Sequence, residues 1–247
     1  YSFRIADAAH APVLPFNTIV NNSLVPGTRL DVYQIAGVAN QEITFQIDNE
    51  YTCSVVLGFV GPGNQLLAEN CLGGDFSVVL PADGTYLFTV SGFAVTPAFE
   101  YSIEARTSAL LAANPASNER SSITVANDAD VTRLLDEAIA RFNAAGIDRQ
   151  RLDAKLQSVQ FVISDLPPSL LGLTAGNTIL IDRDAAGRGW YIDANPADDD
   201  EFSQDDSPEG YDLLTAIMHE LGHVLGADHS SAGLMSERLS SGVRATT

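Results

Sequence analysis

Three histidines and a glutamate are concentrated in one short stretch of the chain. Of the four histidines among 247 residues, His219, His223 and His229 lie within eleven residues of one another. His219 and His223 are four residues apart, so on a helix their imidazoles stand one turn apart on the same face and can share a tetrahedral metal ion. The fourth, His10, stands alone and is expected to be an ordinary surface histidine.

The residues around these histidines complete a catalytic kind of metal site. Gly226 follows His223 by three residues, where a helix commonly ends in a left-handed conformation that glycine adopts cheaply. The chain can then turn back and bring His229 to the metal as a third ligand, which leaves the fourth position for water. Glu220 is placed to act on that water as a general base. The pattern predicts zinc-dependent peptide hydrolysis, and the alternative interpretation is a chance polar match.

The helix that carries this motif is expected to be two-sided. Its apolar residues fall on the arc opposite the histidines, so one face is predicted to join the core while the histidine face lines a cleft. The apolar residues are Leu213, Leu214, Ile217, Met218, Leu221, Val224 and Leu225.

The stretch from His219 to His229 resembles the elongated zinc-binding signature of the metzincin metallopeptidases. Gly233-Leu234-Met235-Ser236 is similar to the Met-turn of that family, and Ser230 resembles the matrixin branch. The resemblance implies that the three histidines bind Zn²⁺, that Glu220 is the general base, and that Met235 is a packed platform beneath the metal. The alternative role for Met235 is generic core filling.

The chain departs from the metzincin pattern in two places. Glu237 stands where the astacin and serralysin branches have a tyrosine, and only twelve residues follow Met235, too few for the C-terminal helix of matrixins. Either the specificity pocket is open or the chain was cut. Residues 187–192 occupy the position of the edge strand on which metzincin substrates pair, although Trp190 could equally be a core residue.

An acidic stretch precedes the motif. Eleven acidic residues lie between Asp182 and Asp212, against only Arg183 and Arg188. Such density favours a Ca²⁺ site, as in the comparable matrixin loop, and the alternative is a solvated acidic loop. The candidate calcium ligands are Asp182, Asp184, Asp193, Asp199 and Asp200.

The first part of the chain is predicted to be an all-β sandwich. Short runs with strand periodicity alternate with turn residues such as Pro26-Gly27 and Asp83-Gly84. Cys53 and Cys71 are separated as two adjacent strands would require, which predicts a disulfide and an oxidising compartment; two free thiols are the alternative. The predicted strands are 29–36, 43–47, 54–59, 65–68, 76–80, 85–90 and 101–105.

This first part resembles the bacterial pre-peptidase C-terminal domain through residues 30–37 and 81–90, which implies an accessory module. Tyr1–Ile5 echoes Tyr101–Ala105, so the chain is expected to open on the end of a preceding repeat. The protein is therefore expected to be part of a longer multidomain protein.

The period of the apolar residues changes in the second part. The sequence predicts a β-sandwich over residues 1–106, a Ser/Ala/Asn-rich linker over 107–128, and a metzincin-like peptidase domain over 129–247. The second domain is expected to be an α+β, zincin-like domain with a small mixed sheet and an active-site helix over 211–225. Its predicted strands are 159–163, 178–181 and 189–193.

Composition excludes several classes of function. With 32 acidic and 13 basic residues the formal charge is −19, and the absence of a basic block argues against nucleic-acid binding. No apolar run reaches the roughly 20 residues that span a bilayer. Because 45% of the residues are hydrophobic, the chain can bury a core. The composition suits a secreted or cell-surface protein whose partner is a protein or peptide substrate.

Two functions from different classes follow from these observations. The first is a secreted zinc endopeptidase preceded by an accessory β-sandwich. The second is a non-catalytic, calcium-dependent surface or adhesion module with a peptidase-like fold. The intact Glu220 favours the first.

Overall fold

The computed structural model divides into two compact units, Tyr1–Thr107 and Ser108–Thr247. Cys53, Cys71 and the echo at Tyr1–Ile5 lie outside the described residues, so the disulfide and the preceding repeat stay predictions. None of the helices in the described ranges is long and apolar enough to cross a membrane. The structure describes residues 7–24, 30–48, 55–70, 74–92, 99–113, 123–202 and 208–245.

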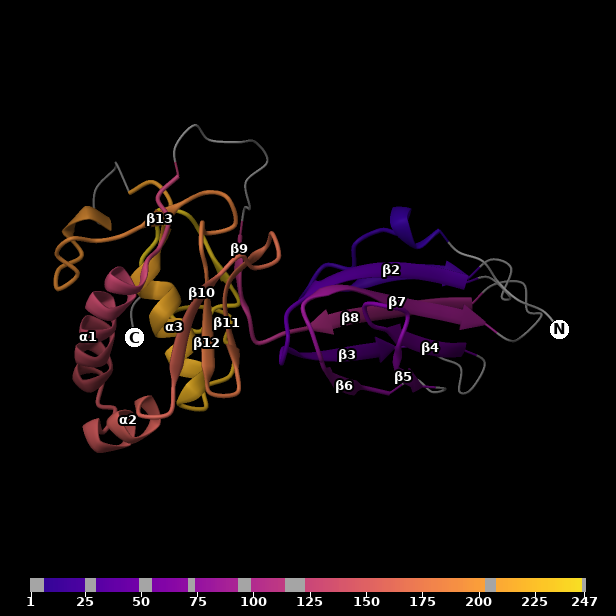
Figure 1. Ribbon diagram of the computed structural model, residues 1–247, viewed down its shortest axis with the longest axis horizontal. Helices are drawn as coiled ribbons and strands as arrows, with labels where there is room; N and C mark the ends of the chain where they lie inside the picture. Colours follow the sequence, from indigo (N-terminus) through magenta and orange to yellow (C-terminus); the bar gives the residue numbers. More distant parts are fainter. Residues whose placement is uncertain are drawn as a thin grey trace. The chain divides into compact units, whose positions relative to one another are not determined.

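The first unit consists of two four-stranded antiparallel sheets (Figure 1). Phe45 on one sheet stacks on Phe88 of the other, with ring centroids 4.6 Å apart, so the sheets pack face to face. A 3-10 turn at Ala8–His10 precedes them. One sheet has the order β1 (Val20–Leu24), β8 (Phe99–Arg106), β3 (Glu42–Asp48), β6 (Phe76–Val79), and the other β2 (Leu30–Gly37), β7 (Gly84–Gly92), β4 (Val55–Val60), β5 (Leu66–Asn70).

The β-rich character of this first region is confirmed, and one strand was missed. β1 reads Val-Asn-Asn-Ser-Leu, and of its five side chains only Leu24 is buried. Such a polar segment has little strand signal of its own. It forms a strand because it pairs with β8 along its whole length, and it lies at the edge of the sheet.

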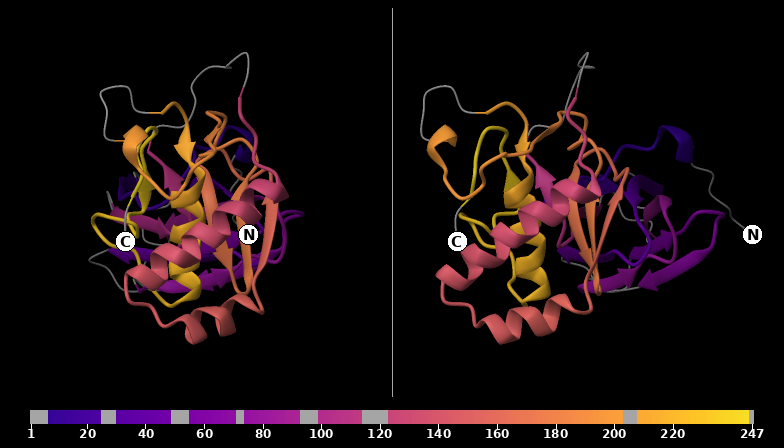
Figure 2. Two further views of the ribbon diagram at one scale, coloured as in Figure 1. Left: turned by 90° about the vertical axis from the view of Figure 1, so that its left-hand side faces the viewer. Right: turned by 60° about the vertical axis from the view of Figure 1, so that its left-hand side comes forward.

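The second unit is built on a mixed five-stranded sheet with the order β10, β12, β11, β9, β15. Figures 1 and 2 show α3 (Leu213–Val224) between these strands and α1 (Asp128–Ala144), in agreement with the contacts of α3 with both. α2 (Arg149–Leu156) follows α1. The strands are β9 (Leu110–Ala112), β10 (Gln160–Ser164), β11 (Leu170–Ala175), β12 (Thr178–Asp182) and β15 (Arg238–Leu239).

α1 follows from local signals in the sequence. The side chain of Asn127 accepts hydrogen bonds from the backbone N–H groups of Ala129 and Asp130 and so caps the helix start. Four apolar residues recur at helical spacing and are buried, and α1 packs against α3. They are Val131, Leu134, Ala138 and Phe142.

The predicted linker is wrong over part of its length. β9, at Leu110–Ala112, is a fully buried strand of the second sheet, and α1 begins at Asp128 inside the predicted linker. Two leucines and one alanine are too few to show periodicity by themselves. The strand forms because β11 and β15 provide hydrogen-bonding partners on both of its sides.

The predicted edge strand at residues 187–192 is shorter in the structure and lies outside the five-stranded sheet. Only Trp190–Tyr191 (β13) is a strand, and it pairs with β14 (Tyr211–Asp212) in a separate two-stranded sheet. Trp190 is a core residue, with its indole N–H donating to the carbonyl oxygen of Asp182. In the five-stranded sheet β9 lies between β11 and β15, and neither of these two strands was predicted from the sequence.

α3 is buried on both faces from Leu213 to Gly222, contrary to the expected two-sided helix, and only its end at His223 and Val224 is half-buried. All ten residues from Leu213 to Gly222 are buried, including Thr215, His219 and Glu220 on the face predicted to line a cleft. β9, β11 and the turn that contains Met235 cover this face. From Leu213 to Gly222 the helix is therefore packed against other parts of the second unit on both faces.

Candidate metal centre

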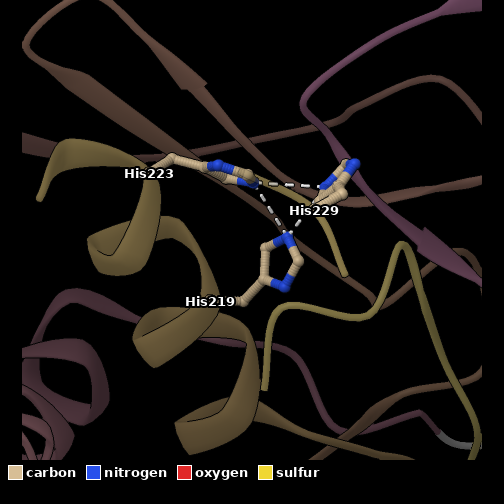
Figure 3. Close-up of side chains that lie close together, drawn as sticks. All are labelled: His219, His223 and His229. Carbon is tan, nitrogen blue, oxygen red and sulfur yellow. Dashed lines mark hydrogen bonds between the residues drawn. The ribbon is translucent and has the colours of Figure 1, made fainter. Parts of the chain in front are cut away.

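α3 and the segment after it bring the three histidines together (Figure 3). His219 and His223 extend from successive turns of the helix, which ends at Val224. Gly226 has a φ of +92°, a left-handed conformation that lets the chain leave the helix and turn back. His229 then reaches the other two imidazoles from outside the helix. Among the residues that the structure describes, these three form the only cluster of potential metal ligands.

The three rings meet through one nitrogen each. The Nε2 atoms are 3.0 Å apart between His219 and His223, and 3.2 Å apart between His229 and each of the other two. The Nδ1 atoms of His219 and His223 lie 2.8 Å from the carbonyl oxygens of Leu234 and Ala227. A carbonyl only accepts, so these contacts assign the ring proton to Nδ1 and leave Nε2 with a lone pair.

Burial keeps these histidines neutral. It lowers the pKa of His219 to about 3 and that of His229 to about 4, and it also lowers the pKa of His223. Neutral imidazole is the form that binds a metal ion. The site is therefore ready for a cation at neutral pH without first having to lose protons.

This geometry fits zinc. Nitrogens bound to a tetrahedral Zn²⁺ at about 2.0–2.1 Å are roughly 3.3 Å apart, close to the separations found here. Lone pairs that converge without a proton between them repel each other, and a cation among them removes that repulsion. The two carbonyl oxygens behind the rings are the outer hydrogen-bond partners that metal-binding histidines usually have.

Met235 packs against α3 next to the histidines. A Cβ placed on Gly222 would clash with the sulfur of Met235, so glycine at that helix position lets the methionine side chain pack closely against α3. The turn is closed by hydrogen bonds from Ser230 N to Met235 O and from Ser236 N to Gly233 O. Because Leu234 in the same turn accepts from His219, the turn fixes the orientation of that imidazole.

Glu220 lies in a buried environment between α3 and the sheet. Its Oε1 accepts from the backbone N–H of Leu110 at 3.3 Å, and its Oε2 accepts from the hydroxyl of Thr174 at 2.8 Å. Gly172 leaves the space for this carboxylate, because a Cβ there would be 2.8 Å from Oε1. Burial raises the pKa of Glu220 to about 8, so this group can exchange a proton near neutral pH.

An open hollow borders the histidine cluster. It is lined by His229, Ser230, Ser231, Ser236, Glu237 and Arg238. The carboxylate of Glu237 lies 4.0 Å from Nδ1 of His229. Glu237 thus places a charged group at the edge of the site. Water can reach the cluster from this side.

The candidate calcium ligands do not gather into one site in the described ranges. Asp182 accepts from the N–H groups of Leu166 and Ala186, and burial raises its pKa to about 6. Asp184 accepts from Gly187 N, while Asp200 starts a short 3-10 turn. Calcium binding stays a prediction.

Asp193 and Asp199 instead pair with arginine. Both carboxylates lie 2.9 Å from Nη1 of Arg244, whose side chain is 2% exposed. Arg141 donates to Asp199 as well. Both arginines lie outside the acidic stretch, so the two arginines inside it, Arg183 and Arg188, understate the positive charge that surrounds it.

The sequence analysis therefore missed four functional neighbours: Leu110, Gly172, Thr174 and Arg244. No local pattern marks Leu110 or Arg244. Gly172 and Thr174 lie in the unpredicted strand β11, in the run Leu-Leu-Gly-Leu-Thr-Ala. A strand assignment for that run would have placed both on the sheet beside the motif helix.

The comparisons with known proteins agree with part of these assignments. The matrixin family model of the M10 peptidases matches residues 178–241, from β12 through the histidines to β15. The match covers well under half of the chain. No curated protein matches the chain.

Two solved structures are similar to part of the chain. One is the pre-peptidase C-terminal domain of a collagenase from Bacillus anthracis, at 18% identity and a TM-score of 0.33, over 42% of this chain and 99% of that one. The other is PliG from Aeromonas hydrophila, a periplasmic inhibitor of g-type lysozyme, at 19% identity and a TM-score of 0.32, over 42% and 92%. TM-scores this low support no inference about function.

Proposed function

We propose that the protein is a zinc-dependent endopeptidase that acts outside the cytoplasm, with its catalytic site in the second unit. The observation that carries this proposal is the convergence of three Nε2 atoms at 3.0–3.2 Å, two of which are left with a lone pair by their Nδ1–carbonyl contacts, with Glu220 on the same helix. His219, His223 and His229 would hold the ion. Bound there, zinc would supply an activated water and a positive charge for the oxyanion that forms during peptide hydrolysis.

The other steps belong to residues of the chain. Glu220 accepts a proton from the attacking water and returns it to the nitrogen of the leaving amine. Thr174 holds one oxygen of that carboxylate and so fixes its direction. Leu234 and Ala227 hold two imidazoles in the tautomer that presents Nε2.

The test is Glu220→Gln, which keeps the size of the side chain and removes the base. We expect zinc content to stay at one ion per chain while cleavage of casein falls by at least about 100-fold. Thr132→Val, on the exposed face of α1, is a control that should change neither. Full activity in Glu220→Gln would show that the base lies elsewhere.

The alternative is a non-catalytic module that keeps the fold. One observation favours it: Glu220 is fully buried, with β9 covering it. The same experiment separates the two functions. A zinc-loaded wild-type chain that cleaves neither casein nor a peptide library would establish the alternative.

A further inference from the structure

β9 lies where an added peptide strand would bind beside the site. It runs antiparallel to β11 on one side and parallel to β15 on the other. Extended peptides are commonly recognised by adding a strand to a sheet edge in this way. Without β9, both β11 and β15 would present an unpaired edge next to α3.

The backbone of this segment is held like a bound peptide. Leu111 N donates to Glu237 O at 2.9 Å, Ala112 N to Ser169 O at 2.8 Å, and Ala113 N to Leu239 O at 2.8 Å. Its bonds thus alternate between the strand on one side and the segment after Met235 on the other. Ala109, Leu110, Leu111 and Ala112 are at most 1% exposed.

One peptide nitrogen of this segment meets the proposed base. Leu110 N donates to Oε1 of Glu220 at 3.3 Å. In amide hydrolysis, the group that takes the proton from water delivers it to the nitrogen that leaves. The peptide bond whose nitrogen is at that position is Ala109–Leu110. The hollow beside the histidines lies close to this bond, because Glu237, which lines the hollow, accepts a backbone hydrogen bond from Leu111. Water can therefore approach the bond from the hollow.

We propose that residues 108–113 are an internal substrate of the second unit, cut between Ala109 and Leu110. In this step the oxygen of water bonds to the carbonyl carbon of Ala109 and the bond from that carbon to Leu110 N breaks. Glu220 carries one proton of the water to the leaving nitrogen. The second proton passes from the new carboxyl group to the released amine, so the products are a carboxylate at Ala109 and an ammonium group at Leu110.

This cut would separate the two units, because the first ends at Thr107. The inference rests on the proposed endopeptidase function and adds its first substrate. It also implies that an external peptide can pair with β11 only after β9 has left. We expect the site to prefer an apolar residue directly after the cleaved bond, because Leu110 belongs to the buried cluster of the second unit.

The experiment follows the intact mass of the purified, zinc-loaded full chain at neutral pH. We expect two fragments, the second beginning at Leu110, with a combined mass larger than that of the chain by one water. The rate should stay the same over about a hundredfold dilution, because the reaction is intramolecular. Glu220→Gln should slow the cut by at least about 100-fold.

Two variants at Leu110 distinguish the effect of losing its backbone N–H from the effect of losing its buried side chain. Leu110→Pro removes the N–H that meets Glu220, whereas Leu110→Ala keeps it, and both lose the buried leucine side chain. We expect the cut to be lost in Leu110→Pro and slowed by less than about tenfold in Leu110→Ala. Equal rates in the two variants would overturn the proposal.

A measurement without turnover checks the position of the segment. In the uncut Glu220→Gln chain, the amides of Leu111, Ala112 and Ala113 should exchange with deuterium as slowly as that of Leu180 in β12. Fast exchange at these three amides would overturn the proposal. So would Glu220-dependent cleavage of casein with Ala109–Leu110 left intact, a result that leaves the endopeptidase function standing. If neither casein nor the chain is cut, the proposed function fails as well.

Discussion

Arg244 binds both carboxylate oxygens of Asp212, with its Nε 3.0 Å from Oδ2 and its Nη2 2.9 Å from Oδ1. Asp212 is also the N-cap of α3, where it accepts from the N–H and the hydroxyl of Thr215. The arginine thereby connects the end of the chain to the start of the helix that carries His219 and Glu220. The whole pair is buried.

The first prediction concerns this ion pair. Arg244→Met should destabilise the second unit by about 3–5 kcal/mol, because it leaves buried carboxylates without their cation. Arg149→Met, at an exposed pair with Asp153, should cost about 0–1 kcal/mol. Trp190, the only tryptophan and a buried residue of the second unit, reports this unfolding by fluorescence in urea. A loss below about 1 kcal/mol for Arg244→Met would contradict the prediction.

The second prediction concerns the space beside Glu220. In Gly172→Ala the new Cβ would lie 2.8 Å from Oε1, so the carboxylate has to move away from Thr174 and Leu110. We expect kcat for casein to fall by at least about tenfold with unchanged zinc content, and stability to fall by about 1–3 kcal/mol. Gly58→Ala is the control, because its Cβ would crowd Thr89 in the first unit. Normal turnover in Gly172→Ala would mean that the position of Glu220 does not matter.

The third prediction concerns pH. The hydrogen bond from Arg141, together with Arg244, holds the pKa of Asp199 below its ordinary value. A carboxyl with a lowered folded pKa contributes stability above its unfolded pKa, and that contribution is lost as the pH falls through the folded pKa. Asp199→Asn should therefore be less stable than wild type at pH 7, and the difference should shrink below about pH 4. A constant difference, measured by Trp190 fluorescence in urea across this range, would refute it.

The fourth prediction concerns removal of the metal. A ligand that binds only the folded state stabilises it, by about 2.7 kcal/mol at a free concentration 100 times its Kd. Chelation should thus lower the melting temperature of the second unit, followed by the fluorescence of Trp190. His10→Ala should respond to chelation like wild type. Identical Trp190 melting curves with and without chelator would rule out a structural contribution of zinc.

The amino-acid sequence determined the elements whose signals are local. The i, i+4 spacing of His219 and His223 defines one helix face, and Gly226 gives the chain the left-handed turn that lets His229 return. The strands of the first unit likewise follow from the alternation of apolar and polar residues within a few positions. Each of these patterns arises from backbone geometry inside one element, so it can be read without knowing the rest of the chain.

Only the tertiary structure decided what surrounds Glu220 and α3. Leu110 pairs with Gly172 and donates to Glu220, which lies 110 residues away in the sequence. Arg244 and Asp212 are 32 residues apart. Such pairings leave no periodicity, because a three-residue strand or a single arginine gains its structure from a distant partner. A segment such as Leu110–Ala112 has no strand signal of its own. It becomes a strand because β11, β15 and the buried carboxylate of Glu220 provide hydrogen-bond partners for its backbone.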